Sequence, residues 1–251
     1  LAMLLPVLGR GRPYGSAGGP FAPSNISIAA NGVRVASTSS ISVPLAIPDV
    51  YANPVGIFLV GGLFDFNAGS LLAPPTIDGQ GLTGIPSWIA TTDLSTPFIG
   101  AYAIRDVPVG TKNFVVSTNS GNGLRSVYVY GAIFPGGEVH PSTFYVDTPV
   151  ASTDASNLNS IAGNITLTEP AYLLKLVVFQ GNDGGTPAEA TNILGYTVDF
   201  AGLLSGNYST TTDQTTFAGR FRATTTGAKN STVQFAQADG RASIVVPVRG
   251  R

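Results

Sequence analysis

The residue types that most often carry chemistry are scarce in this chain, which has one histidine and no cysteine among its 251 residues. The absence of cysteine excludes disulfides, thiolate nucleophiles and thiolate metal sites. Hydrolysis of the Ser–His–Asp kind needs a histidine base beside the serine, and His140 is the only candidate. His140 stands in a connection rich in Pro and Gly, and no Gly-x-Ser-x-Gly motif occurs. We therefore predict that His140 is a solvated loop residue and that the chain has no catalytic residue of its own.

Paired carboxylates could hydrolyse a glycosidic bond, and Asp78 and Asp199 are the pair to consider. They occupy equivalent positions in two related segments, so we do not expect them to face each other across one cleft. Each is predicted to accept backbone hydrogen bonds in the turn after its strand. The stretch 182–185 (NDGG) could offer oxygen ligands to a cation, but it is predicted to be a plain turn. We expect neither a metal site nor a cofactor.

Strand signals dominate the elements that would have to position any site. Short β-branched and aromatic runs are bounded by Gly, Asn or Pro, as in FVVS at 114–117, VYVYG at 127–131, LLKLVVF at 173–179 and SIVVPV at 243–248. Helical periodicity is nearly absent, and parallel α/β folds would need crossover helices. The Asn31–Gly32 dipeptide lies between alternating apolar residues and predicts a tight hairpin over 25–37.

Two parts of the chain resemble each other in the same order. IFLVGG at 57–62 matches LVVFQG at 176–181, and a Phe-x-Gly-x-aromatic pattern occurs at both 98–102 and 217–221. In this pattern the aromatic residues and the glycine alternate, so they share one face of a strand, which is expected to point inward. The neighbouring Arg220 and Arg222 would then face water or a partner. The alternative is that a chain rich in Gly and Thr matches itself by chance.

This repeat predicts an all-β fold of two tandem antiparallel β-sandwich domains of the jelly-roll or immunoglobulin-like kind. The first domain is expected to span 25–135 and the second 145–251, joined by a linker near 135–149. Each copy is predicted to end in a hairpin, through 119–123 in the first and through 238–240 in the second.

Residues 1–24 are predicted to form an extended N-terminal arm. Its apolar beginning precedes its arginines, which is the opposite order to a secretion signal. A partner chain could cover the apolar side chains, or the arm could fold back on its own domain. The arm residues expected to make assembly contacts are Leu4, Leu5, Val7, Leu8, Arg10, Arg12 and Tyr14.

The charge content is unusually low. Thirteen basic and 14 acidic residues leave a net charge of -1, and charged residues make up 11% of the chain, against about 25% in an ordinary soluble domain. Such a surface does not attract nucleic acid, and no apolar stretch approaches the roughly 20 residues of a membrane-spanning helix. Few charges near neutrality favour association, because neighbouring copies then cover much of each exterior.

The segments IFLVGG, PTIDGQGL, FIGAYAIRDVPVGTKNFVVS and VYVYGAIF resemble the small Gly- and Thr-rich β-sandwich modules of tailed-bacteriophage virion proteins. The resemblance covers residues 55–132 and, more loosely, 173–248. It implies a non-enzymatic component of the extracellular virus particle, such as a head decoration, spike, fibre or tail protein. Its expected partners are copies of itself and other virion proteins.

Two other functions stay open. The first is a carbohydrate- or receptor-binding adhesin that contacts a host-surface glycan through loops near Trp88, the only tryptophan. The second is an enzyme whose site is completed by a second subunit, because such a site is not visible in one chain.

Overall fold

Antiparallel β-sheet makes up all the regular secondary structure that the computed structural model describes, in residues 21–64, 74–90, 97–118, 123–154, 160–181, 195–203, 213–234 and 240–251. The prediction of an all-β chain is therefore confirmed. The strands are β1 (Ser27–Thr38), β2 (Ser40–Ile47), β3 (Val55–Phe64), β4 (Thr76–Ile77), β5 (Gln80–Gly81), β6 (Thr83–Ala90), β7 (Pro97–Arg105), β8 (Gly110–Ser117), β9 (Leu124–Phe134), β10 (Val150–Asp154), β11 (Ser160–Ala162), β12 (Ile165–Leu167), β13 (Ala171–Gly181), β14 (Thr197–Leu203), β15 (Asp213–Ala223), β16 (Gly227–Lys229), β17 (Thr232–Gln234) and β18 (Arg241–Arg249).

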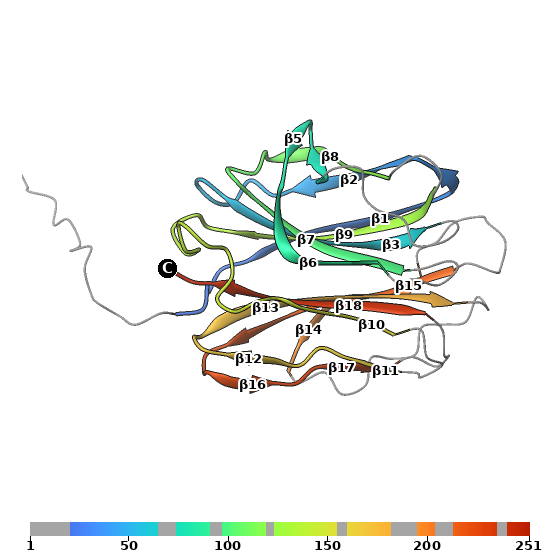
Figure 1. Cartoon of the computed structure of the whole chain (residues 1–251). Helices are drawn as coiled ribbons and strands as arrows, with labels where there is room; N and C mark the ends of the chain where they lie inside the picture. Colours follow the sequence, from blue (N-terminus) through green and yellow to red (C-terminus); the bar gives the residue numbers. More distant parts are fainter. Residues whose placement is uncertain are drawn as a thin grey trace, which may run out of the picture.

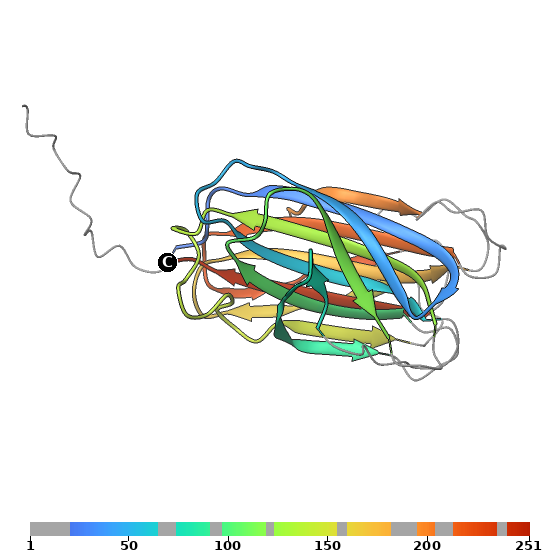
Figure 2. The same ribbon diagram turned by 90° about the horizontal axis from the view of Figure 1, so that it is seen from above.

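The strands are stacked in four layers (Figure 1). The upper outer sheet has the order β2-β8-β4-β5, and the upper inner sheet has the order β1-β9-β3-β7-β6. The lower inner sheet has the order β10-β18-β13-β15-β14, and below it the lower outer layer consists of the pairs β11-β17 and β12-β16. Seen from above, the strands run lengthwise along the molecule (Figure 2).

The burial of each strand follows from its layer. In β2, an edge strand, Ile41, Val43, Leu45 and Ile47 are buried and alternate with exposed residues, as expected for a sheet covered on one face only. In β3, the central strand of the upper inner sheet, all ten residues are buried, because that sheet is covered on both faces. The uninterrupted apolar run of β3 is therefore the sequence signature of a doubly covered strand.

A single apolar cluster joins the two inner sheets. Leu59 and Tyr130 of the upper inner sheet pack in it with Leu174, Leu176 and Ile244 of the lower inner sheet. Of three further clusters of buried residues, one lies between the upper inner and outer sheets and two lie between the lower inner sheet and the lower outer layer. Residues on both sides of the predicted domain boundary therefore share one core, while the boundaries themselves stay a prediction.

The two inner sheets have the same topology. When the strands of each sheet are ranked by their order in the chain, β1-β9-β3-β7-β6 corresponds position by position to β10-β18-β13-β15-β14. Across the central cluster β3 packs on β13, β7 packs on both β18 and β13, and β6 packs on β10, while β9 touches β15 less extensively. Exchanging each strand for its counterpart would predict β15 on β3 and β14 on β1, which are not among the main contacts, so the two sheets do not pack with two-fold symmetry.

The pairing registers align the two copies of the repeat differently from the sequence match. Phe98 pairs with Gly62, whereas Phe217 pairs with Val177. If the two phenylalanines are equivalent, the counterpart of Gly62 is Val177 and not Gly181, which the sequence match gave. A shift of four residues keeps every side chain on the same face of a strand, so alternation alone could not detect it.

The predicted hairpin at Asn31–Gly32 is wrong. β1 continues straight through this dipeptide, with Asn31 opposite Val129 and Gly32 opposite Tyr128. Ile26 and Ile28, before the dipeptide, pack toward the central cluster, and Val33 and Val35, after it, pack toward the upper outer sheet. β1 has a layer on each side, and its larger apolar side chains change from one face of the strand to the other at this dipeptide. In the sequence this change interrupts the alternation in the same way as a turn would.

The two predicted closing hairpins are also wrong. β8 belongs to the upper outer sheet and β9 to the upper inner sheet, so the connection between them changes layer. In the same way β17 lies in the lower outer layer and β18 in the lower inner sheet. Each strand instead pairs with partners distant in sequence, because closing two layers over a core gives more burial than a local hairpin.

The pattern at 98–102 faces inward as predicted. Phe98 and Tyr102 are buried in the cluster between the two upper sheets. In the second copy Phe217 is buried, and Phe221 is half-buried against the lower outer layer. Gly219 lies against the Phe217 ring and the Thr197 carbonyl of the neighbouring strand.

Candidate functional site

One end of the molecule gathers segments that are far apart in sequence, and we call it the terminal face: residues 21–25, 48–54, 105–109, 135–145 and 249–251. The C-terminal residue lies beside the first described residues (Figures 1 and 2). Backbone hydrogen bonds link Val107 to Pro54 and Arg251 to Glu138. The stretch predicted to be a linker is thus held in place, and its Val139 is buried in the central cluster.

The Glu138 carboxylate holds the chain where it enters the fold. It accepts hydrogen bonds from the backbone N–H groups of Ser24 and Asn25, at 2.7 and 3.0 Å, and from their side chains. Partial burial acts to raise the pKa of Glu138, but these hydrogen bonds outweigh it and the pKa is lowered. The charged form is therefore the one that binds residues 24–25.

Arg222 holds the preceding residues from the other side. Its guanidinium donates to the carbonyls of Ala22 and Pro23, at 3.1 and 3.0 Å. The Phe21 carbonyl lies so close to Gly250 that a Cβ there would be 1.5 Å from the oxygen. Arg222 therefore faces the N-terminal segment of its own chain, where the sequence predicted water or a partner.

We expect Glu138→Gln to loosen residues 21–25 without unfolding the sheets. The amide keeps one acceptor oxygen and points an NH2 group at donors, so bonds to Ser24 and Asn25 are lost. Amide hydrogen exchange of these residues should accelerate at least tenfold, while exchange in β3 stays unchanged. In the unaltered protein the protection of these amides, measured against their intrinsic exchange rate at each pH, should fall as pH decreases below about 4.5, the ordinary range of the carboxyl, because stability from a lowered pKa is lost on protonation. Slow exchange retained in the variant would contradict this role of Glu138.

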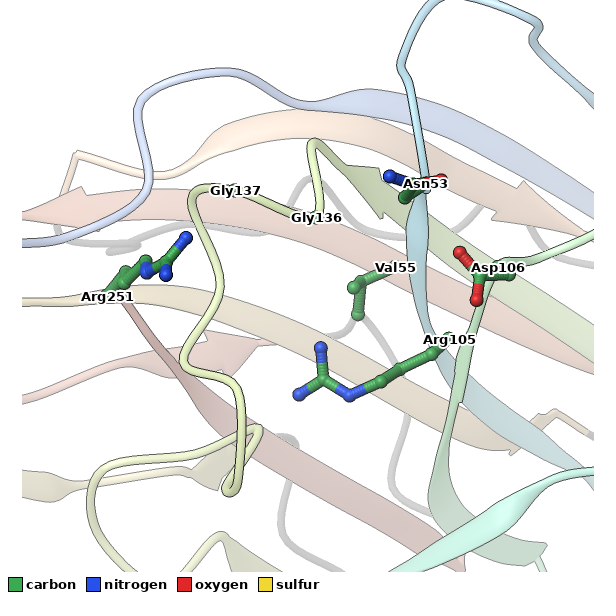
Figure 3. A pocket seen from close by; sticks show the side chains of 7 residues that line it. All are labelled: Asn53, Val55, Arg105, Asp106, Gly136, Gly137 and Arg251. Atoms are coloured by element: carbon green, nitrogen blue, oxygen red, sulfur yellow. The ribbon is translucent and has the colours of Figure 1, made fainter. Parts of the chain in front are cut away.

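A half-open cavity of about 280 Å³ lies on the terminal face (Figure 3). Its wall comes from the segment before β3, the end of β7, the connection after β9, and the C-terminal residue. The lining residues are Asn53, Val55, Arg105, Asp106, Gly136, Gly137 and Arg251.

Arg105 is fixed in this wall. One terminal nitrogen donates to the carbonyls of His140 and Pro141, both at 2.7 Å, and the guanidinium carbon lies 4.8 Å from the centre of the Phe144 ring. These partners are neutral, so they orient the guanidinium without cancelling its charge.

His140 is a loop residue, as predicted. Its Nδ1 accepts backbone hydrogen bonds from Ser142 and Thr143, at 3.3 and 3.2 Å, which places the ring proton of a neutral imidazole on Nε2. The ring therefore shapes the turn after it. The sequence signal was the His-Pro dipeptide, which favours a turn.

Asp78 matches its prediction, and Asp199 does not. Asp78 accepts the backbone N–H of Asn113 at 2.9 Å and forms an ion pair with Lys112 at 3.0 Å; both partners lower its pKa. Asp199 lies inside β14 at a register irregularity and binds Tyr130 Oη at 2.5 Å.

The Asp199 network joins the two inner sheets. Asp199 also forms an ion pair with Arg220, at 3.2 Å, so Arg220 faces its own chain and not only water. Burial, and then the charge of Asp199, raise the pKa of Tyr130. The sequence match of Asp199 with Asp78 failed because β4 belongs to an outer sheet and β14 to an inner one.

Lys175 and Ser231 form a dyad that sequence reasoning missed. Lys175 Nζ donates to the carbonyl oxygen and Oγ of Ser231, each at 2.8 Å, and Ser231 Oγ donates to the Gly163 carbonyl at 2.8 Å. Burial lowers the pKa of Lys175 to about 7. Such a pair can activate a serine nucleophile, but Lys175 is 0% exposed and Ser231 1%, so no substrate reaches it.

The Lys175 dyad has a structural role instead. The lower outer layer is interrupted between β11 and β12 and again between β16 and β17. Lys175 lies beneath this gap, and its ammonium group donates to the Ser231 carbonyl, which also accepts the backbone N–H of Gly163 at 2.7 Å. The sequence signal was the single lysine within an apolar strand.

The remaining residues that the sequence predicts to be functional lie outside the described residues or have side chains that are not described. The assembly contacts Leu4, Leu5, Val7, Leu8, Arg10, Arg12 and Tyr14 lie outside the described residues, as does the stretch 182–185. Trp88 belongs to β6, at an edge of the upper inner sheet, but its side chain is not among those described.

No cofactor or metal centre is apparent in the described ranges. There, no three His, Asp or Glu side chains gather closely enough to hold a metal ion. The same ranges contain no helix of the length and apolarity that a membrane span requires. Comparisons of the chain with protein-family models, curated proteins and solved structures gave no match.

Proposed function

We propose that the chain is a non-enzymatic structural protein of a virus particle, whose copies pack in a symmetric assembly. The observation that carries the proposal is the strand order. Strands β1-β9-β3-β7 and β2-β8-β4-β5 form facing sheets, and successive strands mostly alternate between them. This is the order of a jelly roll, a fold common in viral capsid proteins and lectins. The inference is an analogy of fold, so the surface must support it.

We infer further that the chain contains two jelly rolls in tandem, divided near 135–145 as the sequence predicts. The matching strand orders of the inner sheets support this duplication. The two inner sheets pack face to face through their central strands, β3 and β13. The chain thus resembles a dimer of jelly rolls joined into one polypeptide.

The terminal face supports packing against a second copy of the chain. It exposes Phe21, Val50 and Val109, at 43%, 56% and 37%. Residues 21–25 are fixed on this face by Glu138 and Arg222, so the chain that precedes them enters the fold here. The predicted arm contacts Leu4 to Tyr14 would then reach a neighbouring copy.

Light scattering during size-exclusion chromatography tests the assembly. We expect the full chain to form an oligomer whose mass holds on dilution into the micromolar range. The double variant Val50→Glu and Val109→Glu, and a chain beginning at residue 21, should each shift the mass toward one chain. Val198→Glu is the matched control, because Val198 is 50% exposed but lies on β14, away from this face. A single chain at every concentration up to the millimolar range would overturn the proposal.

A second candidate function is binding of a host-surface glycan, as in an adhesin. The observation that favours it is the cavity of the terminal face, where charged and amide side chains surround one recess.

A further inference from the structure

The dyad of Lys175 and Ser231 is closed to molecules from outside, but a carbonyl group of its own chain lies within its reach. Ser231 Oγ is 2.8 Å from the Gly163 carbonyl oxygen. Because a carbonyl carbon is about 1.2 Å from its oxygen, Oγ lies roughly 3–4 Å from the Gly163 carbon. Reacting atoms poised for attack are about 3–3.5 Å apart. The peptide bond between Gly163 and Asn164 is therefore a group on which this dyad can act without any outside substrate.

The lower outer layer fixes this peptide group beside the dyad. β11 pairs with β17 and β12 with β16 in one continuous register, which places Gly163 directly opposite Ser231 in the gap between the two pairs (Figure 1). The Gly163 N–H donates to the Ser231 carbonyl at 2.7 Å, while the Gly163 carbonyl accepts the Ser231 hydroxyl. A Cβ on Gly163 would be 3.0 Å from Lys175 Nζ and 3.2 Å from Ser231 Oγ. The reacting groups are thus held together before any reaction begins.

Lys175 is suited to act as the general base. Its Nζ lies 2.8 Å from Ser231 Oγ, and burial lowers its pKa to about 7. Above this pH the amine is neutral and can accept the hydroxyl proton, which a lysine of ordinary pKa cannot do near neutrality. Once protonated, Lys175 places a positive charge beside the reacting atoms, where negative charge develops on the Gly163 oxygen.

Other titratable or charged side chains belong to the elements packed against Lys175. Tyr196 hydrogen-bonds Ser231, and burial raises its pKa, so it stays protonated over the range in which Lys175 titrates. Arg241 of β18 alternates with residues of the central cluster and so faces the same interior; arginine keeps its charge in proteins. Lys229 of β16 bonds its own turn. A change of rate between pH 5.5 and 8.5 therefore reports on Lys175.

We propose that Ser231, with Lys175 as its base, cleaves the peptide bond between Gly163 and Asn164 of its own chain. Lys175 Nζ takes the proton of Ser231 Oγ, and Oγ bonds to the Gly163 carbonyl carbon. Lys175 then gives the proton to the Asn164 nitrogen as the C–N bond breaks, which leaves a Gly163–Ser231 ester and a free amine on Asn164. Water hydrolyses the ester, so the serine is restored and Gly163 ends in a carboxylate. Asn164 is exposed, so solvent is one residue away.

The cleaved chain is expected to stay folded. The new ends lie between strands that keep their partners, because β11 pairs with β17 and β12 with β16. The reaction occurs once in each chain, so it is a maturation step and not the turnover of a substrate. It goes beyond the proposed structural function and does not depend on assembly, because all the reacting groups belong to one chain.

Incubation of the full chain at 37 °C tests the proposal. Protein purified at pH 5.5 is held at pH 5.5 or 8.5 and analysed by denaturing electrophoresis, intact-mass spectrometry and N-terminal sequencing. We expect two fragments, residues 1–163 and 164–251, which separate only on denaturation and form at a rate independent of protein concentration. A lysine with a pKa of about 7 is about 3% neutral at pH 5.5 and about 97% neutral at pH 8.5. Cleavage should therefore be about thirtyfold faster at pH 8.5 and level off above it, whereas cleavage by hydroxide would keep accelerating.

Two variants remove the chemistry, and a third is the matched control. Ser231→Ala lacks the nucleophile and Lys175→Met lacks the base, so neither should be cleaved. Ser243→Ala should be cleaved at an unchanged rate. Ser243 is 1% exposed on the neighbouring strand β18, and its Oγ has no hydrogen-bond partner among the described residues. Circular dichroism establishes that each variant is folded.

Hydroxylamine at pH 7 provides a measurement that needs no variant. It attacks an ester that water has not yet hydrolysed, and the expected product is a fragment that ends in the hydroxamate of Gly163, identified by its mass. A chain that stays intact for a week at pH 8.5 and yields no such hydroxamate would overturn the proposal. So would cleavage at the same bond and rate in a folded variant that lacks the serine or the lysine. Neither result changes the expected mass of the native oligomer, so this proposal and the proposed assembly fail separately.

Discussion

Gly61→Val is expected to lower the free energy of unfolding by about 3 kcal/mol, the upper part of the range for overpacked cores. Gly61 lies in β3 where the two inner sheets meet. A Cβ at this position would be 2.3 Å from Val178 Cγ2 and 3.2 Å from Leu176 Cδ2, both on β13. The sheets would have to separate, and contacts across the shared cluster would be lost on both sides.

Gly84→Val is the matched control for Gly61. Gly84 belongs to β6, an edge strand, and nothing lies within 4 Å of the position of its Cβ. Valine is favoured in strands, so the change should be within about 0.5 kcal/mol. Urea unfolding followed by circular dichroism measures both variants. Equal midpoints for the two variants would show that β3 and β13 do not pack as described.

Stability is expected to rise between pH 7 and about 10, by at most about 1.4 kcal/mol per pH unit. Burial lowers the pKa of Lys175 from 10.5 to about 7 in the folded chain. Between these values the unfolded chain binds the proton and the folded chain does not, so raising the pH favours folding. Below pH 7 both states are protonated and this contribution becomes constant.

Above about pH 10 the trend should reverse. Burial raises the pKa of Tyr102 to about 12, and burial also raises those of Tyr128, Tyr130 and Tyr196. A group with a raised folded pKa stabilises the fold below its unfolded value, and this contribution is lost as pH increases further. The chain should therefore be most stable near pH 10.

Lys175→Met isolates the lysine contribution. Methionine fills a similar volume without a charge, so the rise between pH 7 and 10 should disappear while the decline above pH 10 remains. The variant also leaves the Ser231 carbonyl with one donor fewer, but that loss does not depend on pH. The free energies of unfolding of the variant and the unaltered protein, measured at each pH from 6 to 11, test this prediction. If the free energy of unfolding of the variant increases with pH at the same slope, the increase comes from another titrating group.

The local character of the strands could be predicted from sequence. The alternation over 41–47 and the continuous apolar run of β3 correspond to coverage on one face and on two. Which strands pair could not be predicted, because pairing is set by distant residues. Asn31–Gly32 has the composition of a turn, yet β9 and two covering layers keep it extended.

The candidate site was largely invisible in the sequence. Asn53, Arg105, Asp106 and Arg251 are polar residues from three segments, and only the layer changes between strands bring them together. His140 could be interpreted correctly because its role is local to the turn. Asp199 could not, because its partners Tyr130 and Arg220 come from other strands.

Quantitative mass spectrometry of purified virus particles, produced from the genome that encodes this chain, tests the central claim most directly. We expect the chain to remain with the particles through density-gradient purification, at a fixed copy number that is a multiple of a symmetric oligomer. Hundreds of copies would assign it to the shell, and a few copies to a tail or spike. Particles that lack the chain, or carry it only in trace and variable amounts, would contradict a structural role in the virion.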